Sequence, residues 1–127
     1  MAGSIRQLDR GEIMASQPLF SAIVHTYNRP NLLRVAVDAL RKQTHSNIEI
    51  IVVNNGGTPE TADTIEEIKS EDSRVRSVTF TENQYHPNDP MLIVSVCYNA
   101  GLDEAKGEYV WVQEDDDFLA PDYVEKM

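Results

Sequence analysis

The sequence predicts an α/β domain, a three-layer sandwich whose mostly parallel sheet has the strand order 3-2-1-4. Short β-branched runs alternate with helical patterns along the chain, and the run at 48–53 is apolar without alternation, which is typical of a strand covered on both faces. Strand-helix-strand crossovers are right-handed, and in the preferred order 3-2-1-4 the first and fourth strands are neighbours. A ligand crevice is expected at their carboxyl ends.

The first unit is an apolar strand at 19–25, a polar turn at 26–29, and a helix over 31–43 with Pro30 in its first turn. The helix is expected to bury one stripe, made of Leu32, Leu33, Ala36, Val37 and Leu40. The charged residues of its other face, which are expected to point into water, are Arg34, Asp38, Arg41 and Lys42.

The second strand, at 48–53, is expected to end in the turn Asn54-Asn55-Gly56-Gly57. Thr58 then caps a helix that has Pro59 in its first turn. The residues that this helix turns inward are Ala62, Ile65 and Ile68. The segments that follow are a strand at 75–81, a loop at 82–90, a helix at 91–106, a strand at 108–112 and a last helix from Pro121.

The length of 127 residues corresponds to one domain, which we place at 18–127 behind a flexible lead at 1–17. The net charge of −10 disfavours binding to a nucleic-acid polymer or to anionic lipid. The lead lacks the apolar centre of a secretory signal, and no run approaches the roughly 20 apolar residues of a membrane span. A lone cysteine, Cys97, favours a reducing compartment, so the expected location is cytoplasmic.

Several chemistries have no motif here. The sequence contains neither the phosphate-binding loop of P-loop hydrolases nor the glycine fingerprint of dinucleotide dehydrogenases. His25, His45 and His86 lack the spacing of metal ligands. Cys97 lies in an apolar helix, where a buried inert thiol is favoured over a nucleophile.

Three polar segments follow predicted strands and are expected to converge on one site: 26–29, 54–57 and 114–117. The last contains four consecutive carboxylates, and two charges 4 Å apart repel by about 1 kcal/mol even in water. A solvated acidic turn is one interpretation. At a ligand crevice, the favoured interpretation is a site for Mg2+, which bridges the acidic side chains to substrate phosphates. Glu114 and Asp116 are then expected to point the same way.

The other two segments each allow two interpretations. The Asn-Gly segment at 54–57 is either a flexible turn or a place where backbone approaches a ligand and an amide pairs with a base or ribose. Tyr27 is either a core aromatic or a ring on which a nucleobase stacks.

A series of short motifs occurs in a specific order: Ile23-Val24-His25-Thr26-Tyr27-Asn28-Arg29, Gln43-Thr44, Glu49 to Gly56, Asn99-Ala100-Gly101-Leu102, Ala105 to Tyr109, Glu114 to Asp117, and Pro121-Asp122. From about Leu19 to Met127, this series resembles the nucleotide-binding half of family 2 glycosyltransferases of the GT-A fold. Members of that family continue into an acceptor-binding half that supplies the general base. The resemblance therefore implies a truncated GT-A domain with no assigned catalytic residue.

The resemblance implies that the domain binds a nucleotide-diphosphate sugar, with a UDP-sugar expected first, and takes part in inverting transfer to an unknown acceptor hydroxyl. It implies Mg2+ or Mn2+ as cofactor, held by Asp116 and Glu114. The alternative pair of acids, one residue along, is Asp115 and Asp117. It implies base stacking on Tyr27 and a base-edge contact from Asn54. The full set of implied nucleotide contacts is His25, Thr26, Tyr27, Arg29, Asn54, Asn55, Gly56, Glu114 and Asp115.

The sequence departs from the family pattern at a few of these positions. His25 stands where proline is frequent, Asn54 and Asn55 replace a frequent Asp pair, Glu114 replaces the first acid, and Tyr98 stands where an arginine is common. Two alternatives remain open: a nucleotide-sugar binding module without transfer, and a receiver-type phosphoacceptor domain. An open edge on the fourth strand also predicts a homodimer.

Overall fold

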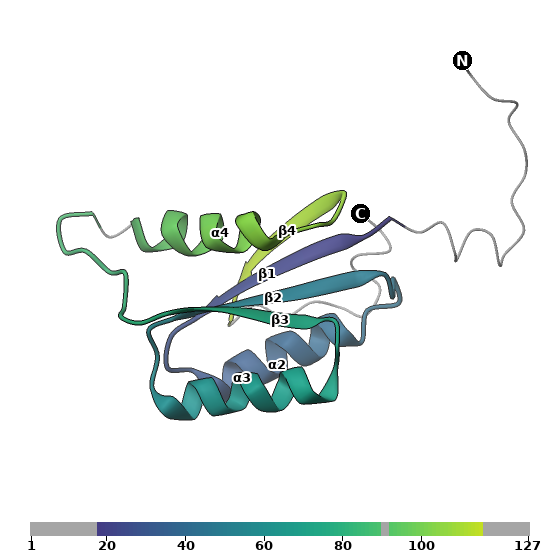
Figure 1. The fold of residues 1–127 in the computed structure, drawn as a ribbon, viewed down its shortest axis with the longest axis horizontal. Helices are drawn as coiled ribbons and strands as arrows, with labels where there is room; N and C mark the ends of the chain where they lie inside the picture. Colours follow the sequence, from purple (N-terminus) through teal and green to yellow (C-terminus); the bar gives the residue numbers. More distant parts are fainter. Residues whose placement is uncertain (1–17, 90–91, 116–127) are drawn as a thin grey trace, which may run out of the picture.

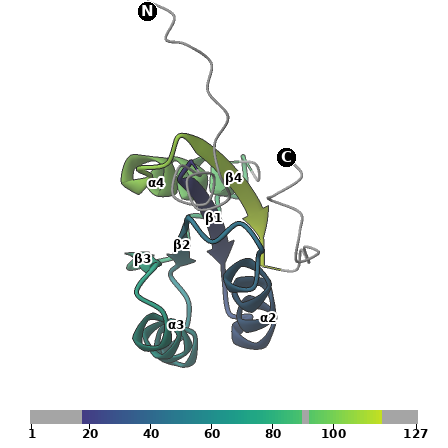
Figure 2. The same ribbon diagram turned by 90° about the vertical axis from the view of Figure 1, so that its right-hand side faces the viewer.

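A computed structural model describes residues 18–89 and 92–115 of the chain. Its four strands form one parallel sheet in the order β3-β2-β1-β4, with the bounds β1 (Phe20–Thr26), β2 (Ile48–Asn55), β3 (Val75–Phe80) and β4 (Tyr109–Glu114). The helices are α2 (Pro30–Arg41), α3 (Pro59–Glu71) and α4 (Leu92–Glu104). Figures 1 and 2 show α2 and α3 on one face of the sheet and α4 on the other.

The predicted α/β class, strand order and cover of both faces are confirmed. The predicted lead at 1–17 and the predicted helix from Pro121 lie outside the described residues. Within the ranges 18–89 and 92–115, helices reach 13 residues, and none is both long and apolar enough to cross a bilayer.

Two predicted strand ends are wrong, and both concern polar residues. Asn54 and Asn55 do not form a turn but belong to β2, where they pair with β3. Gln113 and Glu114 likewise extend β4 and pair with β1. Ladder hydrogen bonds join backbone groups, so pairing continues where the apolar run has stopped. The remaining bounds differ from the prediction by at most two residues.

The core consists of two layers because successive side chains of a strand point to opposite faces. The layer between the sheet and helices α2 and α3 includes the buried side chains of Val24, Leu33 and Ile50, and the layer between the sheet and α4 includes those of Ile23 and Cys97. Burial raises the pKa of the Cys97 thiol to about 11, as expected for an inert cysteine.

Helix α4 lies very close to β1. A Cβ atom on Gly101 would lie 2.4 Å from Cγ2 of the buried Ile23, closer than side-chain atoms can approach. Only glycine therefore allows this approach between helix and strand.

The buried stripe of α2 differs from the prediction at one position. Leu32 is 46% exposed, whereas Ala39 is buried together with Leu33, Ala36, Val37 and Leu40. Leu33, Val37 and Leu40 lie at i, i+4 and i+7 and define the centre of the stripe. Leu32 lies one residue, or about 100°, away from that centre and reaches solvent.

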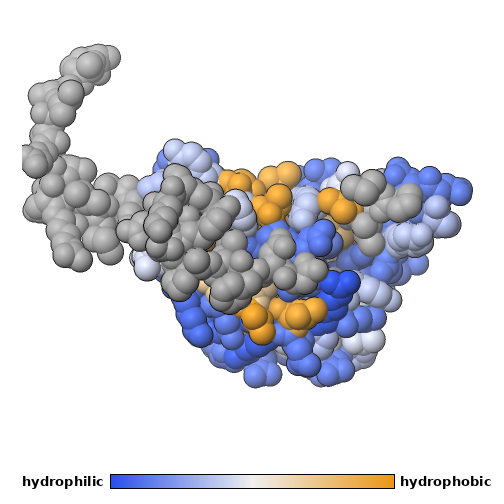
Figure 3. Space-filling model, turned by 180° about the vertical axis from the view of Figure 1, so that it is seen from behind, coloured by the Kyte–Doolittle hydropathy of each residue, from blue (hydrophilic) through white to orange (hydrophobic). Residues whose placement is uncertain are grey.

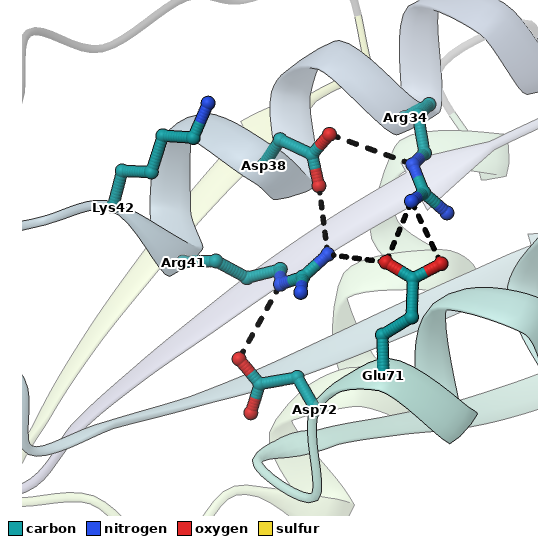
Figure 4. A pocket seen from close by; sticks show the side chains of 6 residues that line it. All are labelled: Arg34, Asp38, Arg41, Lys42, Glu71 and Asp72. Carbon is teal, nitrogen blue, oxygen red and sulfur yellow. Dashed lines mark hydrogen bonds and ion pairs between the residues drawn. The ribbon is translucent and has the colours of Figure 1, made fainter.

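The charged face of α2 was expected to point into water, and this is wrong for three of its residues, which are half-buried against α3 (Figure 4). Arg34 Nη2 donates to both carboxylate oxygens of Glu71, at 2.6 and 2.8 Å. Arg41 Nη1 donates to Asp38 at 2.9 Å and to Glu71 at 3.0 Å. Isolated surface ion pairs contribute little, but a network of this kind can fasten one helix to another.

The end of α3 is joined to this network through Asp72. Arg74 Nη2 lies 2.9 Å from Asp72 Oδ2 and also donates to the backbone oxygen of Arg41 at 3.1 Å. Hydrogen bonds from the Arg74 side chain are the main reason that the pKa of Asp72 falls from 3.8 to about 2.

At the opposite end of the sheet from the loops discussed below, Glu49 connects three segments. Its carboxylate accepts hydrogen bonds from the Ser21 hydroxyl, from the Lys106 N–H at 2.6 Å and from Arg76 at 2.8 Å. Burial opposes ionisation of Glu49, but these donors together hold its pKa below the usual range. The contacts hold the connection between α4 and β4 against β1 and β2.

Strand β4 forms one edge of the sheet and exposes Tyr109, Val110 and Val112. Figure 3 shows apolar patches among hydrophilic surface when the molecule is seen from behind. Parallel strands are normally covered on both faces, and an open edge can pair with a further strand. Association of two copies through β4 stays a prediction, which these exposed side chains support.

We predict that Asp72→Asn lowers the free energy of unfolding by about 2 kcal/mol at pH 7, the equivalent of its pKa shift. The folded-state pKa is depressed, so this stability is present above the unfolded pKa near 3.8 and is lost as the pH falls towards 2. Urea titrations of both proteins at pH 7 and pH 2.5 measure the difference, with the exposed Asp103→Asn as control. A difference that does not shrink at pH 2.5 contradicts the prediction.

Candidate functional site

The pairing register of β1 brings the polar ends of three strands together. Thr26 pairs with Asn54 of β2, and His25 pairs with Glu114 of β4. Because the strands are parallel, the segments that follow them emerge at the same edge of the sheet. The expected convergence of the three polar segments is confirmed as far as Asp115.

A pocket of about 310 Å³ lies at this edge. The residues that line it are His25, Thr26, Tyr27, Arg29, Asn55, Asn83, Val94, Glu114 and Asp115. Seven of them were predicted as nucleotide contacts, whereas the predicted contacts Asn54 and Gly56 are not part of the lining. Asp116 and Asp117 lie outside the described residues.

Asp115 is a buried carboxylate that connects β4 to β1 and the loop after it. Thr26 Oγ1 donates to Asp115 Oδ2 at 2.9 Å, and Arg29 Nη1 donates to Oδ1 at 3.3 Å. Both oxygens of Asp115 therefore already accept hydrogen bonds within the protein. Glu114, the last residue of β4, is exposed, whereas Asp115 is buried. This arrangement favours Glu114 over Asp115 as a ligand-facing acid.

The two asparagines at the end of β2 have different surroundings. Asn54 is buried, and its Oδ1 accepts the Gly57 N–H at 3.0 Å, which closes the turn after the strand. The expected contact of Asn54 with a base edge is therefore not supported. Asn55 lines the pocket, and its Oδ1 accepts the Gln84 N–H at 2.9 Å.

The loops after β1, β2 and β3 support one another. Asn28 adopts a positive φ of 52°, and its Oδ1 accepts the Thr58 N–H at 2.7 Å. Thr58 occupies the N-cap position of α3, but the predicted capping bond from its side chain is absent. Gly56 has φ +71°, and a Cβ there would lie 2.3 Å from the backbone carbon of Glu82. From the sequence, a glycine here is expected to let the backbone approach a ligand. In the structure, Gly56 instead packs closely against the backbone of Glu82.

Two lining residues were not predicted. Asn83 follows β3, the neighbour of β2, and Val94 lies in the first turn of α4. The signal for Asn83 was its place just after a strand of the same parallel sheet. Tyr85, His86 and Asp89 of the same loop are exposed and do not line the pocket.

The described part of the site offers one acid that fits a hard cation. Within 18–89 and 92–115, no three His, Cys, Asp or Glu side chains come together in a way that could hold a metal. Glu114 nevertheless places an exposed carboxylate in the pocket lining. Mg2+ commonly takes one or two protein carboxylates together with substrate phosphates, so these donors fit an ion that arrives with a diphosphate.

Comparison with known proteins matches most of the chain to glycosyltransferases. A family model described as "Glycosyl transferase family 2" matches residues 21–127. The putative glycosyltransferase EpsH of Bacillus subtilis is 36% identical over 110 residues, which are 87% of this chain and 29% of EpsH. The chain thus spans less than a third of that relative.

Solved structures share the fold. Residues 1–349 of S. aureus TarS, crystallised with UDP-GlcNAc, match with a TM-score of 0.69 and 25% identity over 84% of this chain and 29% of TarS. The mannosyltransferase PcManGT from Pyrobaculum calidifontis, solved with GDP-Man and Mn2+, matches with a TM-score of 0.68 and 22% identity, covering 85% of this chain and 30% of that chain. The second likeness concerns the fold alone.

We predict that Thr26→Val destabilises the protein by about 2 kcal/mol, because it removes one of the donors to the buried Asp115 carboxylate without changing side-chain volume much. Urea denaturation at pH 7 measures the loss. Thr79→Val, at an exposed position of β3, is the matched control and should change stability little. Equal stability of Thr26→Val and wild type would show that this hydrogen bond does not hold β4 to β1.

Proposed function

This chain belongs to glycosyltransferase family 2, and we propose that it forms the nucleotide-sugar-binding half of a metal-dependent glycosyltransferase with the GT-A fold. The observation that carries the proposal is that Tyr27, Asn55 and Glu114, from three different segments, line one pocket at the carboxyl edge of the sheet. Such edges are where open α/β sheets bind ligands.

The base and the diphosphate have separate places in this proposal. Tyr27 is 44% exposed in the loop after β1, as a ring for base stacking must be. Arg29 is already paired with the buried Asp115, and the chain has a net charge of −10. A diphosphate therefore needs another source of positive charge to remain in this pocket.

Mg2+ or Mn2+, held by Glu114 and Asp116, is the proposed source. Bound there, the ion would offset the charge that develops on the departing diphosphate. The protein's own contribution is to orient Glu114 into the pocket, because Asp115, the next residue, is anchored by Thr26 and Arg29.

The proposed reaction transfers the sugar with inversion. An acceptor hydroxyl oxygen bonds to the anomeric carbon as the bond from that carbon to the diphosphate oxygen breaks. The nucleoside diphosphate leaves with the electron pair, and the hydroxyl proton passes to a general base. No residue of this chain is assigned as that base, and a UDP-sugar is the proposed donor, in line with the UDP-GlcNAc complex of TarS.

A nucleotide-sugar binding module without transfer is the second candidate, since none of the residues that line the pocket is assigned as a general base. It predicts the same binding but no release of sugar in an assay with acceptors. The receiver-type phosphoacceptor domain is rejected as an alternative, because the chain belongs to the glycosyltransferase family.

We predict that UDP together with Mn2+ raises the melting temperature by several degrees, since ligand at a hundredfold excess over Kd adds about 2.7 kcal/mol of stability. Asp116→Ala and Glu114→Ala should each abolish the rise, because UDP then has no cation to bridge it to the acidic site. Asp103→Ala, which removes an exposed acid from α4, should keep it. Differential scanning fluorimetry with and without Mn2+ measures the effect. An unchanged melting temperature with every common nucleotide sugar and metal would reject the proposed function.

A further inference from the structure

We infer that His25 is a further ligand of the proposed cation, through its ring nitrogen Nε2, and that this nitrogen makes the site favour Mn2+ and other transition ions over Mg2+. The inference rests on the proposed function and adds a metal ligand and a metal preference to it. His25 stands where the family pattern frequently has proline, whose side chain carries no donor atom, so this ligand is a feature of the present chain.

His25 and Glu114 lie side by side at the carboxyl edge of the sheet. They pair in the parallel register of β1 and β4, and both line the pocket. Neighbouring strands lie about 4.8 Å apart, and residues paired in register direct their side chains to the same face. For His25 this is the face covered by α4, because its ring lies edge-on to Tyr98 of that helix with centroids 5.2 Å apart. The spacing of histidines in the sequence gives no sign of the pair, since the partner is an acid on another strand.

Nε2 of His25 is buried and, among residues 18–89 and 92–115, has no hydrogen-bond partner. Buried polar atoms are nearly always paired in native proteins, so an unpaired one on a residue that lines a pocket indicates a partner from outside the chain. The other histidines differ. His45 Nε2 lies 2.7 Å from the backbone oxygen of Pro18, and His86 is exposed outside the pocket lining.

A cation fits this nitrogen because a carboxylate stands beside it. Neutral imidazole is the commonest metal ligand among side chains and coordinates through a ring nitrogen. Two ligands that are each about 2 Å from one ion lie about 3 Å apart, which side chains on adjacent strands can reach. In the described part of the chain no third His, Cys, Asp or Glu completes a metal site with His25 and Glu114. Phosphate oxygens and the proposed ligand Asp116 would complete it.

The nitrogen donor decides which ion is held best. Mg2+ and Mn2+ both accept carboxylate, phosphate and water oxygens, but Mg2+ gives up its waters reluctantly, whereas imidazole suits transition ions. The affinity of such a site rises from Mn2+ to Co2+. His25 should therefore add affinity for Mn2+, more for Co2+ and little for Mg2+.

The first test is isothermal titration calorimetry of the 127-residue chain with UDP. Mg2+, Mn2+ or Co2+ is present at saturation, so that UDP carries the metal before it meets the protein. His25→Phe keeps an aromatic ring beside Tyr98 and removes both nitrogens. It should weaken UDP binding about tenfold in Mn2+, more in Co2+ and less than about twofold in Mg2+. His86→Phe, at an exposed position outside the pocket lining, should keep all three affinities.

The second test is a spectroscopic signature of the ligand itself. Electron spin echo envelope modulation of Mn2+ detects the nitrogen of a coordinated imidazole. The wild-type complex with UDP and Mn2+ should show this modulation, and histidine labelled with the heavy nitrogen isotope should change it. The modulation should be absent from His25→Phe and present in His86→Phe.

The outcomes separate this inference from the proposed function. Equal weakening of UDP binding in all three ions, or a wild-type spectrum without imidazole nitrogen, overturns the metal ligand while nucleotide binding stands. Absence of UDP binding with every ion overturns both. If circular dichroism shows that His25→Phe does not fold, the labelled spectra of wild type and His86→Phe decide, because His45 is already bonded to Pro18.

Discussion

The position of β1 between β2 and β4 is the constraint on which the site depends. Parallel pairing on both sides of one strand puts His25 beside Glu114 and Thr26 beside Asn54. A shift of one residue in either register would move every side chain of a strand to the opposite face. The two-layered core opposes such a shift, because it would expose one set of buried apolar side chains and bury polar ones.

Two neighbouring acids at the end of β4 have different surroundings. Asp115 accepts hydrogen bonds from Thr26 and Arg29 and holds the end of β4 to β1, while Glu114 is exposed in the pocket lining. A run of carboxylates is thus less costly than its charge suggests, since one member is neutralised within the protein. The same neutralisation leaves Arg29 paired, which is why the proposed diphosphate site depends on a cation.

The loops at this edge are held by side-chain oxygens that accept backbone N–H groups. Asn28 reaches Thr58, Asn54 reaches Gly57, and Asn55 reaches Gln84. Each bond ties a loop to a strand end or to a neighbouring loop, so asparagine side chains help to fix the loops around the pocket. An amide that gives its oxygen to the backbone keeps its NH2 group for another partner.

Local pattern in the sequence was sufficient for the α/β class and for the buried second strand, which follow from apolar periodicity, a property of short segments. The strand order was a preference compatible with right-handed crossovers, and the expected meeting of Tyr27 with Glu114 at one edge depended on it. Strand ends, the burial of Asp115 and the different roles of Asn54 and Asn55 were decided only by the tertiary structure. They depend on which backbone groups and side chains lie opposite one another, and residues such as Thr26 and Asp115, 89 positions apart in the chain, become partners only after the sheet has formed.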